Sequence, residues 1–161
     1  MSYLIGQGFD THQLANGYKL IIGGIEIPFA KGSKGHSDGD VLIHAMVDSL
    51  LGAISAGDIG TYFPSSDDQW KGADSRIFLE HAMKAIQDKG YEIKNIDSTI
   101  ILQKPHINSY INQMRENLSE MMNISIDKVS VKATTTDYLG FTGRGEGIAS
   151  SSIVLLQEKE D

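Results

Sequence analysis

The chain has 161 residues and a formal net charge of −7, from 14 Lys and Arg against 21 Asp and Glu, which fits one domain spanning residues 1–161. The acidic balance, without a basic stripe interleaved with aromatic residues, excludes a nucleic-acid partner. The absence of cysteine excludes disulfides, thiolate ligands and cysteine nucleophiles, so any metal site must use His, Asp or Glu.

The start of the chain carries no targeting signal. No charged region precedes an apolar core, and no apolar run approaches the roughly 18 residues that a membrane span needs. We therefore expect no membrane partner and a cytoplasmic location in a bacterium.

The first third of the chain predicts strands followed by one helix. Residues 3–13 favour a strand, and the turn at Asn16-Gly17 precedes strand-like segments at 18–22 and 25–29. Residues 31–36 are rich in Gly and Lys and indicate a loop. A helix of about four turns then begins at Asp38 or Asp40 and runs to Ala56, where Gly57 stops it.

The remainder alternates helices and strands. A polar, turn-rich loop at 63–73 precedes a helix from 74–75 to 89–90, a strand at 93–103 and a helix at 108–122. Strands at 128–135 and 148–156 flank a glycine-rich segment at 140–147. These elements predict an α+β fold: a four-stranded mixed sheet with helices packed on one face, plus a small β-hairpin.

Three residues have the spacing of a metal site. Asp10 and His12 are two apart on a predicted strand, so both side chains point to one face. His44 lies within a predicted helix, with Asp40 and Asp48 four residues to either side on its own stripe. An imidazole flanked by carboxylates is typical of a metal ligand that a neighbouring residue orients.

Asp10, His12 and His44 would give Zn²⁺ three protein ligands and one open position, the pattern of catalytic zinc. The same set suits non-haem Fe(II). The residues are also compatible with surface hydrogen bonds on a strand and a histidine in a polar network.

Several segments have the composition of anion sites. His36 and Ser37 precede the helix that carries His44, where phosphate can dock or the segment can simply cap the helix. Asp58 can accept hydrogen bonds from substrate hydroxyls or close a turn. The run Lys132–Asp137 offers one cation, three hydroxyls and a carboxylate suited to Mg²⁺, or is an ordinary β-branched strand. No P-loop or dinucleotide fingerprint is present.

Five segments in order resemble one known family. The segments GFDTHQL, GHSDGDVLIHA, GDIGTYFP, KGADSR and VKATTTDYLGFTGRGEGIA are similar to those of the 2-C-methyl-D-erythritol 2,4-cyclodiphosphate synthase family, over residues 5 to 156. The resemblance implies an enzyme of the non-mevalonate isoprenoid pathway. Its small CDP-linked substrate, CDP-methylerythritol 2-phosphate, is cyclised by attack of the 2-phosphate on the β-phosphorus, with release of CMP.

The resemblance also implies roles for individual residues. One Zn²⁺ per subunit is held by Asp10, His12 and His44, and Mg²⁺ or Mn²⁺ comes with the substrate to Asp137; His36 and Thr135 are catalytic. The implied substrate-binding set is Asp10, His12, His36, Ser37, Asp58, Ile59, Gly60, Phe63, Pro64, Ser65, Ser66, Asp67, Leu102, Gln103, Lys104, Pro105, His106, Ile107, Asn108, Thr134, Thr135, Thr136, Asp137, Phe141 and Arg144. Within this set, residues 102–108 and 134–136 line the cytidine pocket.

The resemblance further implies a homotrimer with its active sites between subunits. A central cavity can then hold an isoprenoid diphosphate near Phe9, Arg144 and Glu146. Two alternatives to the cyclase stay open: a non-catalytic trimer that binds isoprenoid diphosphates, and a non-haem Fe(II) oxygenase.

Two positions depart from the family pattern. The family usually has Glu at the position of Asp137, and the shorter side chain predicts a longer contact to Mg²⁺ or one through a water. It commonly has Asp at the position of Ser65, where a hydroxyl makes a weaker hydrogen bond to a substrate hydroxyl.

Overall fold

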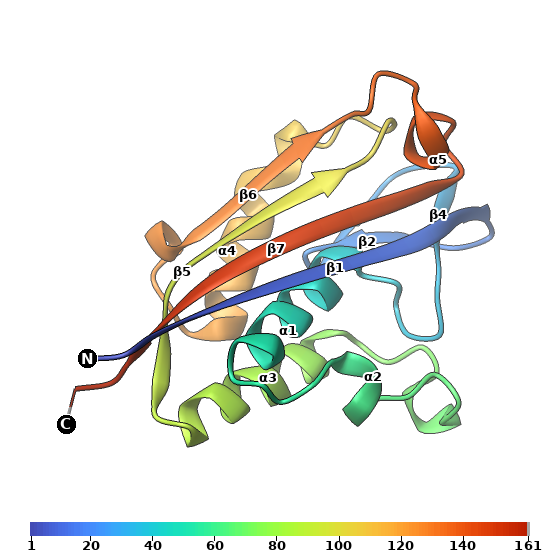
Figure 1. The fold of residues 1–161 in the computed structure, drawn as a ribbon. Coiled ribbons are helices and arrows are strands. Elements are labelled where there is room, and N and C mark those ends of the chain that lie inside the picture. The colour runs from blue at the N-terminus through green and yellow to red at the C-terminus, as the bar shows by residue number, and fades with distance from the viewer. Residues whose placement is uncertain (161) are drawn as a thin grey trace.

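The computed structural model describes residues 1–160, which form a layer of helices packed on one face of a mixed sheet (Figure 1). Within these residues the sheet has the order β4-β1-β7-β5-β6, and β2 and β3 form a separate hairpin. The strands are β1 (Tyr3–Asn16), β2 (Leu20–Ile22), β3 (Ile25–Ile27), β4 (Lys31–Lys34), β5 (Tyr91–Ile101), β6 (Val129–Thr134) and β7 (Gly147–Glu158). β5 and β6 are parallel, and the other pairs are antiparallel.

Three longer helices cover the sheet, and the remaining helical pieces are single turns. The longer helices are α1 (Val41–Ala53), α3 (Arg76–Asp88) and α4 (Ile111–Met122). The single turns are α2 (Ile59–Tyr62), α5 (Gly140–Gly143) and three 3₁₀ turns at Asp68–Trp70, Asn108–Tyr110 and Ile126–Lys128. No helix among residues 1–160 is long and apolar enough to cross a membrane.

The α+β class, the single face of helices and the small hairpin agree with the sequence prediction, but the number of strands does not. Within residues 1–160 the main sheet has five strands rather than four. The segment Lys31–Lys34, expected as a loop, pairs with the last four residues of β1 as strand β4. Its Gly and Lys content has no strand signature, and the pairing arises because β1 extends three residues further than predicted.

The other predicted elements are present, with shifted ends. Helix α1 begins at Val41 after the N-cap Asp40, whose side chain accepts a hydrogen bond from Ile43 N, and it ends at Ala53 rather than Ala56. The loop at 63–73 contains a 3₁₀ turn, and the glycine-rich segment opens with the short helix α5.

Helix α1 packs directly on β1, through two glycines. On β1 the even-numbered side chains face the helices, because side chains alternate along a strand. A Cβ at Gly6 would overlap the carbonyl oxygen of Ser49, and one at Gly8 would overlap that of Ala45. The glycines therefore let the backbones of strand and helix approach much more closely than side chains would allow.

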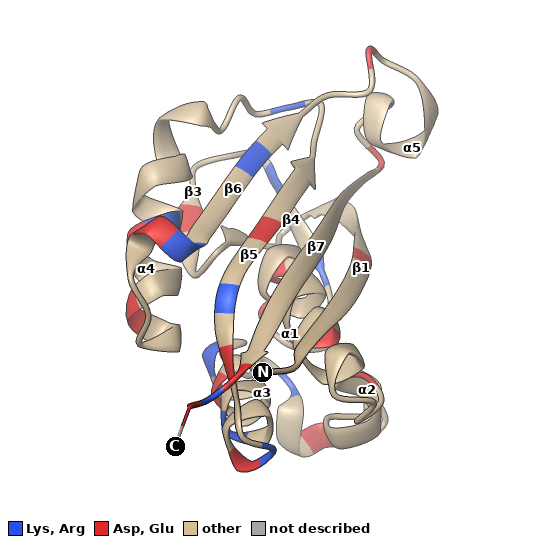
Figure 2. Cartoon of the chain, turned by 60° about the vertical axis from the view of Figure 1, so that its left-hand side comes forward, with Lys and Arg blue, Asp and Glu red and all other residues tan. Residues whose placement is uncertain are grey.

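The other face of the sheet is open, and over β1 and β7 it carries exposed apolar side chains. Ile5, Phe9 and Ile153 are 73%, 54% and 51% exposed. Ile153 on β7 pairs with Gln7 on β1, and Ile5 and Phe9 lie two residues to either side of Gln7 on the same face. The three apolar side chains are therefore neighbours. Figure 2 shows β7 without charged residues until its end. Contiguous exposed apolar side chains of this kind mark an interaction surface.

We predict that Gly8→Ala lowers the free energy of unfolding by about 3 kcal/mol or more, because the new methyl group overlaps a helix backbone that cannot move aside. The matched control is Gly52→Ala in α1, whose Cβ would meet its nearest atom at 3.9 Å. This control should be neutral or stabilising by up to about 1 kcal/mol. Urea unfolding of both variants measures the difference; equal stabilities would show that α1 does not pack as described.

Candidate metal centre

Strand β1 and helix α1 bring Asp10, His12 and His44 together. Asp10 Oδ2 lies 2.9 Å from His12 Nε2 and 3.1 Å from His44 Nδ1. The two ring nitrogens are 3.1 Å apart. One ligand atom from each residue lies within 4.8 Å of the others. The predicted convergence of these three residues on one point is confirmed.

The electrostatics of the cluster suit a cation. Burial alone would raise the pKa of the Asp10 carboxyl, but hydrogen bonds with His12 and His44 outweigh it and lower the pKa to about 2. Burial likewise acts to lower the pKa of His12, and the hydrogen bond to Asp10 outweighs it and raises that pKa. Asp10 is therefore an anion across the physiological range, as a metal ligand must be.

The outer nitrogens of both imidazoles have partners of their own. His12 Nδ1 lies 3.3 Å from the carbonyl oxygen of Lys34 on β4. His44 Nε2 lies 2.9 Å from Ser75 Oγ and 3.1 Å from Ser37 Oγ. A histidine that binds a metal usually donates its other N–H to such an acceptor. The inward nitrogens and the Asp10 oxygen therefore fit a divalent metal, with donors that suit zinc or Fe(II).

The carboxylates four residues from His44 do not contact its ring. Asp40 is fully buried and accepts hydrogen bonds from the backbone N–H groups of Gly23, Gly24 and Ile43. Burial raises its pKa to about 6 despite these donors. Asp48 accepts from the N–H of Ile59 instead. The expectation that one of these aspartates orients the imidazole was wrong, since the backbone of neighbouring loops uses both.

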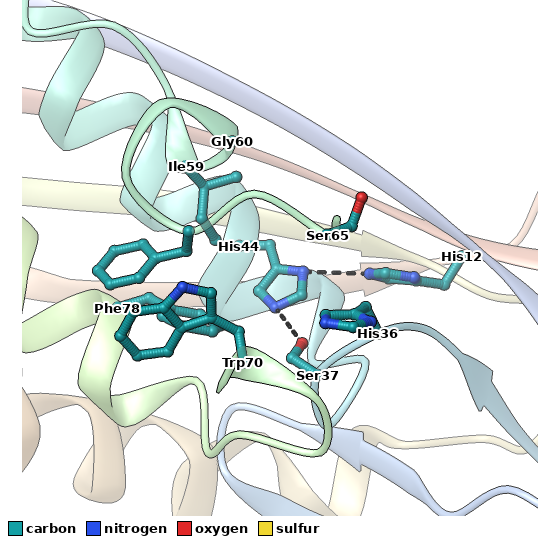
Figure 3. A pocket seen from close by; sticks show the side chains of 10 residues that line it. His12, His36, Ser37, His44, Ile59, Gly60, Ser65, Trp70 and Phe78 are labelled. Carbon is teal, nitrogen blue, oxygen red and sulfur yellow. Dashed lines mark hydrogen bonds between the residues drawn. The ribbon is translucent and has the colours of Figure 1, made fainter. Parts of the chain in front are cut away.

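A cavity of about 250 Å³ opens beside the cluster (Figure 3). Its lining includes His12 and His44 and six further predicted site residues, His36, Ser37, Ile59, Gly60, Phe63 and Ser65, and also Trp70 and Phe78. Trp70 and Phe78 were not predicted from the sequence. Phe78 lies on the buried face of α3, where an aromatic residue is indistinguishable from ordinary core.

Trp70 and Phe78 form an aromatic wall of the cavity with Phe63. The ring centroid of Phe63 lies 4.5 Å from that of Phe78 and 4.9 Å from that of Trp70, within the range of attractive aromatic pairs. Trp70 is the only tryptophan of the chain. Its place in an otherwise polar loop was the available sign that this loop folds back over apolar surface.

The loop from α2 to Trp70 is tied down beside the cluster. His36 Nε2 donates to the carbonyl oxygen of Asp67 at 2.9 Å, joining the segment before α1 to this loop. Asp58 caps α2, with its carboxylate accepting from the N–H and hydroxyl of Thr61. In this structure Asp58 therefore has the turn-closing role weighed from the sequence. Pro64, Ser66 and Asp67 are exposed.

The remaining predicted residues lie where β5 and β6 end and in the segments that follow these two strands. A cavity of about 100 Å³ is lined by Leu102, Pro105, His106, Ile107, Asn108, Ala133, Thr134 and Thr135. A neighbouring cavity is lined by Gln103, Lys104 and Arg144, among others. Another cavity is lined in part by Phe141. The hydroxyl of Thr136 forms a hydrogen bond with that of Thr142. Asp137 is exposed and has a positive φ of 52°.

The metal cluster and the cavity beside Thr134 lie at strands on opposite sides of the sheet, β1 and β6, with β7 and β5 between them. Thr11 pairs with Ala149, Ala149 with Ile101, and Ile101 with Thr134. Three steps between neighbouring strands span about 14 Å. Within β6, Val129 and Val131 are buried whereas Thr134 alternates to the exposed side. A single chain thus holds the metal cluster and Thr134 apart, on opposite faces.

Two expected cations are paired within the chain. Lys132 Nζ lies 2.6 Å from Asp97 and lowers the pKa of that carboxyl, which burial alone would raise. Arg144 Nε lies 2.8 Å from Glu146. Both pairs are largely exposed, and ion pairs of this kind are weak.

Comparison with known proteins identifies relatives over nearly the whole chain. The model of the YgbB family matches residues 3–157. Proteins of Bacillus cytotoxicus and Bacillus mycoides named 2-C-methyl-D-erythritol 2,4-cyclodiphosphate synthase are each 55% identical over 157 residues, covering 98% of this chain and 99% of theirs.

Solved structures share the fold. A Plasmodium falciparum IspF in complex with CDP superposes with a TM-score of 0.88 at 36% identity, covering 99% of this chain and 98% of that one. The bifunctional IspDF of Campylobacter jejuni gives a TM-score of 0.95 at 37% identity. The match covers 99% of this chain but only 43% of that longer one.

We predict that the purified protein retains one divalent transition-metal ion per chain and that His44→Ala loses it, because two donors hold such an ion far more weakly than three. The control is His106→Ala, which removes an exposed histidine outside the cluster. Elemental analysis after gel filtration measures the metal, and circular dichroism confirms that each variant is folded. A folded His44→Ala protein with a full complement of metal would contradict the assignment.

Proposed function

The chain belongs to the YgbB family, and we propose that it catalyses the cyclisation of 4-diphosphocytidyl-2-C-methyl-D-erythritol 2-phosphate in the non-mevalonate isoprenoid pathway. An oxygen of the 2-phosphate bonds to the β-phosphorus, and the bond from this phosphorus to the oxygen shared with the α-phosphate breaks. The products are 2-C-methyl-D-erythritol 2,4-cyclodiphosphate and CMP. The observation that carries the proposal is the metal cluster beside a cavity, in a chain 55% identical to synthases over nearly its full length.

We propose zinc as the metal of Asp10, His12 and His44, one ion per chain. Three protein donors with one open position are typical of catalytic zinc. A Mg²⁺ or Mn²⁺ ion would come with the diphosphate and meet Asp137, directly or through a water. When bound, these cations supply the positive charge that lets two phosphates approach each other. The chain has only three arginines and is acidic overall, so its own side chains supply little of that charge.

The residues of the chain bind and orient the substrate. The imidazole of His36, held through Nε2 by the Asp67 carbonyl, and Ser37 line the cavity beside His44, where phosphate oxygens would lie. The aromatic wall of Phe63, Trp70 and Phe78 offers an apolar surface to the carbon skeleton of methylerythritol. No general base is needed, because a phosphate oxygen is already nucleophilic. Orientation within one substrate can contribute about 7–11 kcal/mol to lowering the barrier.

We propose that the cytidine end binds in the cavity of about 100 Å³ beside Thr134 and Thr135 of a neighbouring subunit. This division is supported by the separation of about 14 Å across the sheet and by the side chain of Thr134, which points to the face opposite the metal cluster. The CDP complex of a Plasmodium falciparum relative supports a nucleotide as the ligand. Thr135 of one chain would then orient phosphates that His36 of another contacts.

A homotrimer is the proposed assembly. The open face of the sheet, with Ile5, Phe9 and Ile153 exposed, provides an apolar surface to be covered by other subunits. The space enclosed by three such faces would be lined by apolar side chains near Phe9 and by the Arg144–Glu146 pair. An isoprenoid diphosphate is the ligand that this combination of apolar lining and guanidinium would take.

The two alternative functions receive less support. The donor set of the cluster is equally suited to an Fe(II) oxygenase, but the named relatives are cyclodiphosphate synthases. A non-catalytic isoprenoid-binding trimer would not need the metal cluster and its cavity, which this chain has retained.

We predict that zinc-loaded protein with Mg²⁺ converts CDP-methylerythritol 2-phosphate to the cyclic diphosphate and CMP in equal amounts, followed by ³¹P NMR and chromatography. Chelation of all divalent ions should stop turnover, and His44→Ala should be inactive while folded. Consumption of oxygen with iron bound and no release of CMP would replace this proposal by the oxygenase.

We predict that two inactive variants restore activity when they share a trimer. In His44→Ala the metal half of each site is lost, and in Thr135→Ala the nucleotide half. Each site of a ring combines the metal half of one chain with the nucleotide half of the next. A site in a randomly mixed trimer is therefore intact only when the first chain is Thr135→Ala and the second is His44→Ala, so co-expression should restore about a quarter of the wild-type sites. Differently tagged chains verify the mixing. Verified mixed trimers that stay as inactive as their parents would contradict a site shared between subunits.

A further inference from the structure

Ser75 stands at the N-cap of α3 but does not cap it. Serine is favoured at this position because its hydroxyl usually accepts a hydrogen bond from the second or third N–H of the helix. Ser75 makes no such bond and has helical φ and ψ of −63° and −14°. The residue is fully buried. Its hydroxyl is therefore used for something other than the helix that it precedes.

Both hydrogen-bonding capacities of this hydroxyl point to other segments. Ser75 Oγ lies 2.5 Å from Asp38 Oδ1 and 2.9 Å from His44 Nε2. Asp38 is held in place in turn, because Oδ2 accepts from the N–H of Ser75 at 2.9 Å and Oδ1 accepts from the N–H of Asp40 at 3.1 Å. A chain of contacts thus runs from a carboxylate through a hydroxyl to the imidazole of the metal cluster.

The order of donors along this chain follows from the chemistry of its members. A carboxylate without a proton can only accept, so the single hydroxyl proton of Ser75 is donated to Asp38. The lone pairs of Ser75 Oγ are then free to accept, and the partner within reach is the Nε2–H of His44. An imidazole with its proton on Nε2 presents an unprotonated Nδ1, the atom that faces Asp10 and His12.

We propose that Ser75 and Asp38 are positioning residues that hold the imidazole of His44 with its Nδ1 toward the metal. The proposal rests on the proposed function only through the metal at Asp10, His12 and His44. Ser75 touches neither substrate nor metal, and Asp38 acts through Ser75. Both belong to segments, 36–40 and 73–75, that the Asp38 carboxylate ties together.

Ser37 does not fulfil this role equally. Its Oγ is also 3.1 Å from His44 Nε2, but the residue is only half-buried and lines the cavity beside the cluster. Its hydroxyl is therefore accessible to water and ligand, which can exchange for the contact. The contact of Ser75 is buried, shorter, and backed by a carboxylate, which strengthens a hydrogen bond.

The test measures zinc affinity in the full-length protein, independently of turnover. Ser75→Ala should raise the dissociation constant of zinc about 10- to 100-fold in competition with a chromophoric chelator, the usual effect of losing such a partner. The matched control is Ser49→Ala, which removes another fully buried hydroxyl, from α1 itself. It should leave zinc affinity within about threefold of wild type, while Ser75→Thr, which keeps the hydroxyl, should restore most of the affinity.

A second readout separates positioning from a structural link between loops. In zinc-loaded protein labelled with ¹⁵N-histidine, the Nε2–H of His44 should exchange slowly with solvent, and in Ser75→Ala it should exchange at least tenfold faster. Asp38→Asn should weaken zinc binding, but adding it to Ser75→Ala should cause little further loss, because both act through one contact.

Wild-type zinc affinity and unchanged Nε2–H exchange in folded Ser75→Ala would overturn the proposal. An equal loss of zinc affinity in Ser49→Ala would overturn it as well, because the loss in Ser75→Ala would then reflect general destabilisation of the protein. Neither outcome depends on whether CMP is released. Failure of the inference is therefore distinguishable from failure of the proposed function.

Discussion

The direct packing of helix α1 on strand β1 is the constraint on which the rest of the site depends. Two glycines let the backbones meet, and this contact sets His44 above Asp10 and His12. The buried carboxylate of Asp40 caps the helix through the N–H of Ile43 and holds its start to the β2–β3 hairpin through two backbone N–H groups, those of Gly23 and Gly24. Each ligand therefore lies on a regular element, which holds metal donors more precisely than a loop would.

The metal cluster could be predicted from the sequence because it follows from local periodicity. Two residues at i and i+2 share a face of any strand, and the imidazole of a histidine within a buried helix needs a polar partner. The partners of the ligands could not be predicted in this way. Ser75 lies 31 residues beyond His44, and its contact depends on how α3 packs. The sequence instead favoured Asp40 and Asp48, which periodicity places near His44 but which hydrogen bonds direct elsewhere.

The fold shows the same division between local and long-range information. Helices and hydrophobic strands were predicted to within a few residues, because their patterns are local. Strand β4 has no such pattern and exists because the end of β1 offers an unpaired edge. The aromatic wall was missed for a related reason, since Phe78 resembles core and Trp70 becomes cavity lining only when its loop folds over α3. The loop that carries Trp70 and the helix that carries Phe78 thus form one cavity wall together, and neither segment indicates it alone.

The order of the strands has a consequence for how the metal centre matures. All three ligands belong to the first 44 residues, yet β1 pairs along most of its length with β7, the last strand of the chain. While the protein is being made, the segment carrying Asp10 and His12 lacks this neighbour until synthesis is nearly complete. The pairing that fixes β1 within the sheet is therefore completed only once the carboxyl-terminal strand has been made. The strand made last thus supports the strand that carries two of the three ligands, which links the amino-terminal metal cluster to the carboxyl-terminal part of the chain.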